Sequence, residues 1–358
     1  MSTRILHRYL WGSLIRGYLP VLAILVAVFS LFDFIGEVDK VEGGRYTFWA
    51  AGEFVFLTLP GRFVVLAPFI ALLGSILALG GLANGRELLA MQMSGISHYQ
   101  IAWAVMQVGI VFVLIVACLE EYVTPILDQN AHRSRSLALS DSQAYQGKQG
   151  LWFRENDRYI RIKALKYGEI PQNIDIFEFD HDGQMTAYLF AEEADVTNPQ
   201  KWILKNIHKI VIKGFHVSQE TLSQIVWDSP LQREEMRLLT LPASSLAPSD
   251  LFYYIEILQR KNQNVLGYEL AFWGKIFMPL KTGLMILVAI PFAFGPLRTA
   301  TAGKRVLLGG LVGIGYYLTS EIFEQMGVLL GASALLTTAI PFLGLVVAMS
   351  FFWWAYFS

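Results

Sequence analysis

Six stretches of about twenty mostly apolar residues dominate this sequence, and each is long enough to cross the hydrocarbon core of a membrane as a helix. Hydrophobic residues make up 54% of the chain and charged residues only 16%, a composition typical of an integral membrane protein. The sequence therefore predicts an α-helical membrane bundle of six transmembrane helices. The expected spans are residues 17–35, 60–83, 101–123, 273–294, 306–326 and 332–354.

Basic residues gather at one end of these spans. They are Arg4, Arg8 and Arg16 before the first span, Arg86 after the second, and Arg298, Lys304 and Arg305 after the fourth. Because positively charged loops stay in the cytoplasm, both termini are expected on that side. The first apolar run has no small-residue cleavage site after it, so we expect a retained span rather than a signal peptide.

The middle of the chain has a different pattern, in which charged residues return and apolar residues alternate with polar ones. Residues 159–163, 173–179 and 185–191 are predicted strands, with further strand segments at 202–204 and 208–213. Short strands joined by turns favour an antiparallel sandwich or an open roll. The expected domains are a membrane half at 1–123, an inserted all-β domain on the outer side at 124–248, and a connecting helix with a second membrane half at 249–358.

The loop between the second and third spans, Asn84 to Ser97, has helical character of its own. Its residues 86–93 are good helix formers, with Leu88 and Met91 on one side and charged or polar residues on the others. We expect a short amphipathic helix at the cytoplasmic face of the membrane.

The sequence contains no G-x-x-x-x-G-K-[ST] phosphate-binding loop, no H-E-x-x-H zinc motif and no G-x-S-x-G nucleophile motif. The Gly-Lys pairs that begin at Gly147, Gly274 and Gly303 lack the spacing and the following Ser or Thr of a phosphate-binding loop. The single cysteine, Cys118, can form no internal disulfide, and a net charge of −1 argues against a nucleic-acid binder. We therefore expect no catalytic residue, no metal and no cofactor bound by this chain itself.

Charged residues inside or beside the spans are open to two interpretations, because a charge in lipid must face water, protein or the interface. Four of these residues are Asp33, Lys281, Glu321 and Glu324. They either pair between helices or line a polar cavity or a subunit seam. Five basic residues lie at the outer rim: Lys40, Arg45, Arg62, Arg133 and Arg135. They either contact phosphates of an amphiphile or anchor the helices at the interface.

Several segments in order resemble one known family. They are Ala71-Leu72-Leu73-Gly74-Ser75, Arg86-Glu87-Leu88-Leu89-Ala90-Met91-Gln92-Met93-Ser94-Gly95, Gly150-Leu151-Trp152, Trp273-Gly274-Lys275-Ile276-Phe277-Met278-Pro279-Leu280 and Phe294-Gly295-Pro296-Leu297-Arg298. Together they resemble the LptF/LptG permease family of the lipopolysaccharide export ABC transporter, and the last three are closer to its LptG branch. The similarity runs nearly end to end.

The resemblance implies a permease subunit of the bacterial inner membrane that extracts lipopolysaccharide from the outer leaflet. It implies four partners: an LptF-like permease, an LptB-like ATPase dimer that binds the ATP, an LptC-like single-span protein, and lipopolysaccharide. The inserted domain is then a periplasmic β-jellyroll that passes lipid to LptC. The loop helix at 84–97 becomes a coupling helix that docks on the ATPase through Arg86, Glu87, Leu88, Met91 and Met93.

The resemblance also implies phosphate contacts at the outer end of the first span. Gly36 stands where the family has a lysine, which leaves Lys40 and Arg45 there, whereas Arg135 sits close to the family pattern. Two other functions stay open on the residues alone. One is a lipid-modifying membrane enzyme with Glu321 and Glu324 as an acid/base pair and His132 as helper. The other is a structural scaffold for a periplasmic complex.

Overall fold

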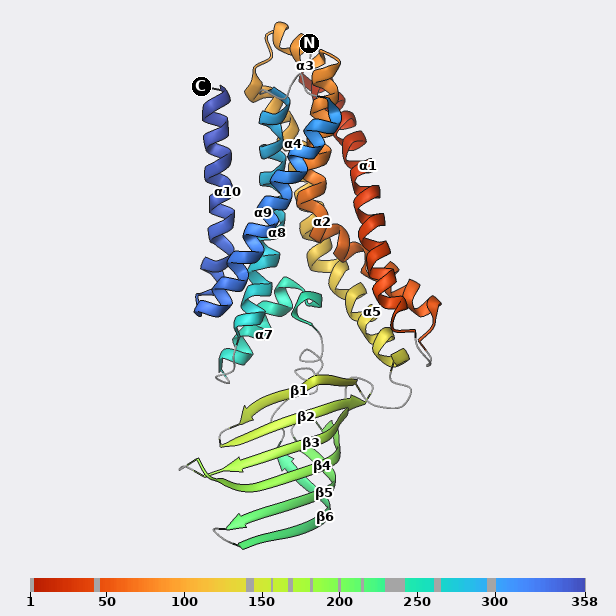
Figure 1. The fold of residues 1–358 in the computed structure, drawn as a ribbon, viewed down its shortest axis with the longest axis vertical. Coiled ribbons are helices and arrows are strands. Elements are labelled where there is room, and N and C mark those ends of the chain that lie inside the picture. Colours follow the sequence, from red (N-terminus) through yellow and green to blue (C-terminus); the bar gives the residue numbers. More distant parts are fainter. Residues whose placement is uncertain are drawn as a thin grey trace.

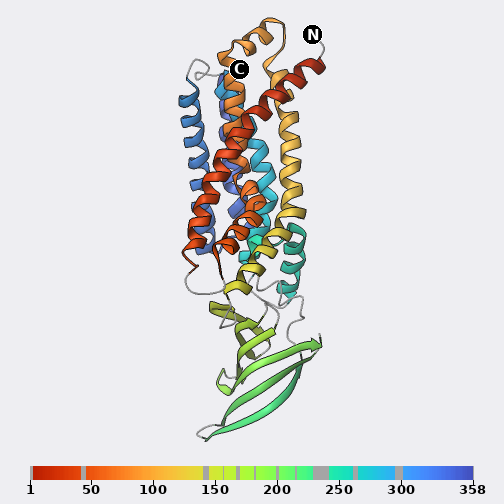
Figure 2. The ribbon, with the colours of Figure 1, turned by 90° about the vertical axis from the view of Figure 1, so that its right-hand side faces the viewer.

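The computed structural model describes residues 3–41, 46–139, 145–155, 157–166, 170–180, 183–198, 201–213, 216–228, 242–260, 265–294 and 301–357. Long helices form a bundle, and an antiparallel sheet lies beyond one end of it (Figure 1). We call this the sheet-side end and the opposite one the far end. Both termini lie at the far end, as the perpendicular view also shows (Figure 2).

In the part of the chain that the structure describes, six helical segments are long and apolar enough to cross a membrane, as the sequence predicts. Five of them lie in α1 (Thr3–Val38), α2 (Phe48–Asn84), α8 (Leu266–Phe294), α9 (Ala302–Leu330) and α10 (Ala334–Phe357). The third begins with α4 (His98–Cys118) and continues to Arg135. Helix α2 is the central one, since 72% of its most apolar window is buried, against 6% in α1 and 11% in α9. The chain is therefore organised around α2, with α1 and α9 at the periphery.

Glycines allow α1 to approach α2 closely. A Cβ atom added to Gly17 would stand 2.5 Å from the carbonyl oxygen of Gly74, and one added to Gly74 would meet the ring of Tyr18. The Tyr18 hydroxyl is also hydrogen-bonded to Ser75 Oγ at 3.0 Å. Small residues at a helix crossing let backbones touch, which is the common means of packing helices in lipid.

The third span continues well beyond the apolar run. Ser97 and Gln100 form a capping box that starts α4, and a π-helical turn, η1 (Leu119–Val123), joins α4 to α5 (Thr124–Leu139). Thr124, where the outer domain is expected to begin, therefore lies within a helix that runs toward the sheet. The chain returns to the membrane through a short 3₁₀ turn, η2 (Ala243–Ser245), and α7 (Pro248–Arg260), which begins one residue before the connecting helix expected from residue 249.

The described strands of the inserted domain form one antiparallel sheet in the order β1-β2-β3-β4-β5-β6. The strands are β1 (Tyr145–Glu155), β2 (Arg158–Lys166), β3 (Ile170–Phe179), β4 (Met185–Asn198), β5 (Lys201–Lys213) and β6 (His216–Asp228). One buried cluster follows the sheet, with Ile160, Ile174, Leu189 and Trp202 among its members. A helical bundle with an inserted all-β domain is thus confirmed. The described strands form a curved meander, without the crossovers that define a jellyroll (Figure 2).

Candidate functional site

The loop between α2 and α4 contains a short helix, α3 (Glu87–Met93), as its helix-forming residues predict. Leu88 is 3% exposed and joins the bundle core, whereas Leu89 is 51% and Met93 is 83% exposed. The helix ends where Gly95 adopts a φ of +85° and the Ile96 N–H donates to the Met91 carbonyl. Helix α3 is therefore anchored by Leu88 and presents other apolar side chains to the outside at the far end of the bundle.

Two polar contacts tie the region of α3 to peripheral helices. The Tyr9 hydroxyl of α1 donates a short hydrogen bond to the Glu87 carboxylate. The Arg305 guanidinium of α9 donates to the Gly80 carbonyl at 2.5 Å and to the Asn84 side-chain oxygen at 2.9 Å. Sequence reasoning missed Tyr9 and used Arg305 only to place a loop in the cytoplasm.

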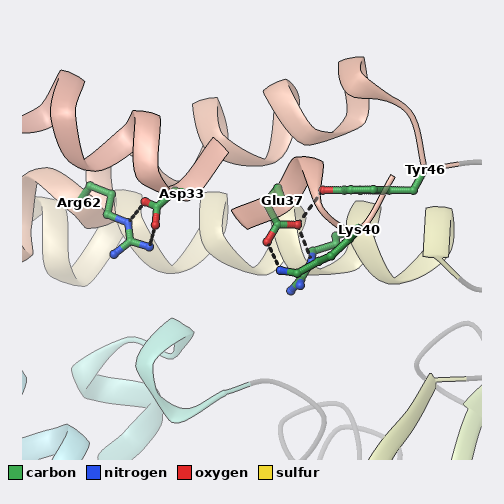
Figure 3. A network of polar contacts seen from close by, with 6 residues as sticks. Asp33, Glu37, Lys40, Tyr46 and Arg62 are labelled. Atoms are coloured by element: carbon green, nitrogen blue, oxygen red, sulfur yellow. Dashed lines mark hydrogen bonds and ion pairs between the residues drawn. The ribbon is translucent and has the colours of Figure 1, made fainter. Parts of the chain in front are cut away.

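Acidic residues near the sheet-side end of α1 form ion pairs with most of the basic residues that the sequence analysis suggests as phosphate contacts (Figure 3). Asp33 pairs with Arg62 at 2.5 Å. Glu37, which is 6% exposed, pairs with Lys40 at 2.6 Å and with Arg135 at 2.9 Å, and accepts a hydrogen bond from Tyr46 at 2.9 Å. Burial and the Glu37 carboxylate together raise the pKa of Tyr46 above its ordinary value.

Lys40 and Arg135 thus share the Glu37 carboxylate, whereas Arg62 pairs with Asp33. The Arg135 guanidinium also lies 5.1 Å from the centre of the Phe54 ring. Arg133 is exposed, and Arg45 lies outside the described residues. The structure thus gathers Lys40 and Arg135, which the sequence groups only by their charge, and it makes Glu37 their common partner.

The intramembrane charges divide into paired and loosely associated ones. Asp33 is paired with Arg62, as the inter-helix interpretation expects. Lys281 lies close enough to Glu324 for the two charges to interact, and Glu321 accepts a hydrogen bond from Gln325 at 3.3 Å. Sequence analysis missed one buried pair: Lys275 on α8 donates to Glu120 in η1 at 2.6 Å, with side chains 11% and 7% exposed.

The residues of the alternative enzyme do not share one element. Glu321 and Glu324 lie on α9, whereas His132 lies on α5 with its ring against Phe54, 5.5 Å between centres. Helix α9 slants away from α5 toward the sheet-side end (Figure 1). Among the described residues, no group of three or more His, Cys, Asp or Glu is arranged to hold a metal ion.

Comparison with known proteins decides the family. The model of the family described as lipopolysaccharide export system permease LptF/LptG matches residues 8–356. The chain therefore belongs to the LptF/LptG family. Among curated relatives, the lipopolysaccharide export system permease protein LptG of Haemophilus influenzae is 32% identical over 351 residues, covering 98% of this chain and 97% of that protein. The protein of the same name from Escherichia coli K12 is 29% identical over 341 residues, covering 94% of both chains.

Family membership agrees with the resemblance seen in the sequence motifs and with the six candidate spans. The match includes both membrane halves and the inserted sheet, so no large part of the chain lies outside the family pattern. This chain is a multi-pass membrane protein of a permease family.

Proposed function

We propose that this chain is the permease subunit of an ATP-driven transporter that extracts lipopolysaccharide from the outer leaflet of the bacterial inner membrane. It then passes the lipid to a periplasmic bridge. The observation that carries the proposal is the end-to-end match to a family described as lipopolysaccharide export permeases. The relatives that match over nearly their whole length carry the same description in their names.

The arrangement of the chain supports one orientation in the membrane. Both termini and α3 lie at the end of the bundle opposite the sheet (Figures 1 and 2). Arg86, Lys304 and Arg305 also lie at that end, and basic loops are retained in the cytoplasm. In our proposal the far end is cytoplasmic and the sheet is periplasmic.

The energy source is then a partner, an LptB-like ATPase dimer that binds the ATP. The sequence has no phosphate-binding loop, so this subunit is not an enzyme and takes no cofactor of its own in our proposal. Helix α3 is the proposed docking element, because its exposed Leu89 and Met93 offer apolar surface at the cytoplasmic end. Arg86, Glu87, Leu88 and Met91 complete the proposed coupling helix.

The peripheral helices support a second membrane-embedded partner. Helices α1 and α9 expose large apolar side chains, including Leu31, Phe32, Leu311 and Leu318. Such faces suit lipid, a second span-rich chain, or the acyl chains of the transported molecule. We propose an LptF-like permease as that second chain and an LptC-like single-span protein as the acceptor of lipid.

A reconstitution experiment tests this function. The chain is coexpressed with candidate partners, extracted in mild detergent and placed in vesicles that contain lipopolysaccharide. ATP is expected to drive lipid release to a soluble acceptor, and replacement of residues 86–93 by a Gly/Ser loop is expected to abolish it. Release that survives this replacement, or a complex that contains no ATPase, contradicts the proposal.

A further inference from the structure

A buried arginine joins α9 to the last two turns of α2. Arg305 is in the first turn of α9 and is only 1% exposed. It donates from Nη1 to the Gly80 carbonyl at 2.5 Å and from Nη2 to Asn84 Oδ1 at 2.9 Å. Asn84 is the final residue of α2, and α3 begins at Glu87. Charged donors form the stronger hydrogen bonds, so this contact fixes α9 just before the proposed coupling helix.

Gly80 makes room for the guanidinium. A Cβ atom added to Gly80 would lie 2.5 Å from Arg305 Nη1 and 3.2 Å from its Cδ. Any side chain at this position would therefore displace the guanidinium from the Gly80 carbonyl and from Asn84 Oδ1. The guanidinium of Arg305 therefore fills the space that the missing side chain of Gly80 leaves beside α2.

The contact continues along one face of α9. Gly309 and Gly313 follow Arg305 at intervals of four residues, and residues spaced in this way share a helix face. A Cβ atom on Gly309 would meet Ile76 Cδ1 at 2.4 Å, and one on Gly313 would meet the Phe69 ring at 3.1 Å. One turn on, the Tyr317 and Phe69 rings lie 6.1 Å apart.

Close packing over this length joins α9 to the far half of α2. Beyond Tyr317, α9 is peripheral, since every residue from 318 to 330 except Gly327 is exposed or half-buried. A displacement at the far end of α2 would therefore reach α9 through this face, and the hydrogen bonds of Arg305 would oppose sliding of the two helix ends past each other. The outer part of α9 would then swing at the sheet-side end.

We propose that Arg305 is a positioning residue that transmits movement of α3 to α9. The inference rests on the proposed function, in which a partner ATPase moves α3. Arg305 touches neither ATP nor lipid in this proposal. It keeps the first turn of α9 in register with the last turns of α2, so that work done on α3 reaches the lipid-facing surface of α9.

The test uses the reconstituted complex and the ratio of lipid released to ATP hydrolysed. We expect Arg305→Met to lower this ratio about tenfold, within the 5- to 150-fold range of coupling between distant sites, while ATP hydrolysis persists. Arg305→Lys should recover part of the loss, because one ammonium group can reach one acceptor. Lys304→Met is the matched control: it removes the neighbouring exposed charge and should leave the ratio unchanged.

A double-mutant cycle separates this role from general destabilisation. Gly80→Ala alone should resemble Arg305→Met, because the added methyl group displaces the guanidinium. Added to Arg305→Met, it should cause little further loss, because methionine has no guanidinium to displace from the two acceptors. The proposal is overturned if the losses of this ratio in the two single variants multiply in the double variant. It is also overturned if Arg305→Met keeps the wild-type ratio. If that variant does not assemble, Asn84→Ala, which removes one acceptor, decides by the same ratio.

A distance measurement distinguishes failure of this inference from failure of the proposed function. Spin labels are placed at the exposed residues Tyr122 and Leu329, after replacement of the single cysteine, Cys118. ATP should change the distance between the labels in wild type but not in Arg305→Met. A wild-type complex that moves but releases no lipid counts against the proposed function alone. Equal movement in both proteins overturns the transmission by Arg305.

Discussion

The Lys275 ammonium donates to the Glu120 carboxylate at 2.6 Å, between residues 155 positions apart in the sequence. The contact joins α8 to the π-helical turn η1 at the sheet-side end of the bundle. A π-helical turn adds a residue to the helical path and redirects the side chains around it. Here that turn places Glu120 against α8, and the two charges satisfy each other where water is scarce.

Removal of one partner of this pair should destabilise the protein strongly. Glu120→Leu leaves the Lys275 charge buried, which costs about 3–5 kcal/mol of unfolding free energy. The double variant Glu120→Leu with Lys275→Met removes both charges and should lie near wild type. Thermal unfolding in detergent measures the difference.

The exposed pair of Arg260 and Glu256 provides the matched control for this prediction. Its atoms are 2.5 Å apart, but its side chains are 77% and 50% exposed. Arg260→Ala should therefore cost less than about 1 kcal/mol. Equal losses from the two single substitutions are incompatible with a stabilising buried pair between Lys275 and Glu120.

Charge reversal at Glu87 should uncouple ATP hydrolysis from lipid release, because Glu87 begins the proposed docking helix. The structure adds a necessary control, since Glu87 also accepts a hydrogen bond from Tyr9. Tyr9→Phe removes that bond alone and leaves the carboxylate available to a partner. Because one hydrogen bond contributes about 1 kcal/mol, Tyr9→Phe should keep release within about fivefold of wild type.

Parallel assays of ATP hydrolysis and lipid release compare the two variants. Glu87→Arg is expected to hydrolyse ATP without release. If Tyr9→Phe loses release to the same extent, Glu87 acts by holding α1 rather than by meeting the ATPase. Normal release by Glu87→Arg argues against the coupling role of α3 itself.

The spans and α3 were predictable because their causes are local. An apolar run of the right length and a series of good helix formers specify helices without reference to the rest of the chain. The contacts of Arg305 and Lys275 could not be predicted from the sequence. Each joins residues 155 or more positions apart and depends on how the helices pack. The π-helical turn gave no recognisable pattern either.

The sheet was predicted only in part, because only some of its strands carry a clear local pattern. Strands β2, β3 and β4 alternate clearly between apolar and polar residues, whereas β6 is mostly polar over His216–Gln224 and was missed. The expected segments 202–204 and 208–213 are one strand, β5, because Ile207 is buried and continues the apolar face between them. Whether the basic rim residues contact lipid depends on Glu37, whose two ion pairs the sequence does not reveal.

Glu37 should limit the binding of lipid phosphates at the rim. Its carboxylate pairs with Lys40 and Arg135, and it is almost completely buried. Glu37→Gln removes the competing charge and should tighten lipopolysaccharide binding about tenfold, the effect of a charge-assisted hydrogen bond. Binding is measured in detergent against the dephosphorylated lipid, which should show no gain. A variant that carries both Glu37→Gln and Arg135→Ala should lose most of the improvement. An unchanged affinity in Glu37→Gln assigns Lys40 and Arg135 to anchoring.

Two glycines of α1 should respond to alanine with opposite signs. A Cβ atom on Gly12 meets nothing within 4 Å, whereas one on Gly17 would lie 2.5 Å from the Gly74 carbonyl oxygen and 2.8 Å from Ala78 Cβ. Alanine is the better helix former, so Gly12→Ala should raise the unfolding free energy by about 0.5–1 kcal/mol. Gly17→Ala gains the same propensity but separates α1 from α2, and overpacking of this kind costs about 1–3 kcal/mol. Thermal unfolding in detergent should therefore shift the midpoint up for Gly12→Ala and down for Gly17→Ala. Stabilisation by both substitutions contradicts the close crossing of α1 and α2 at Gly17 and Gly74.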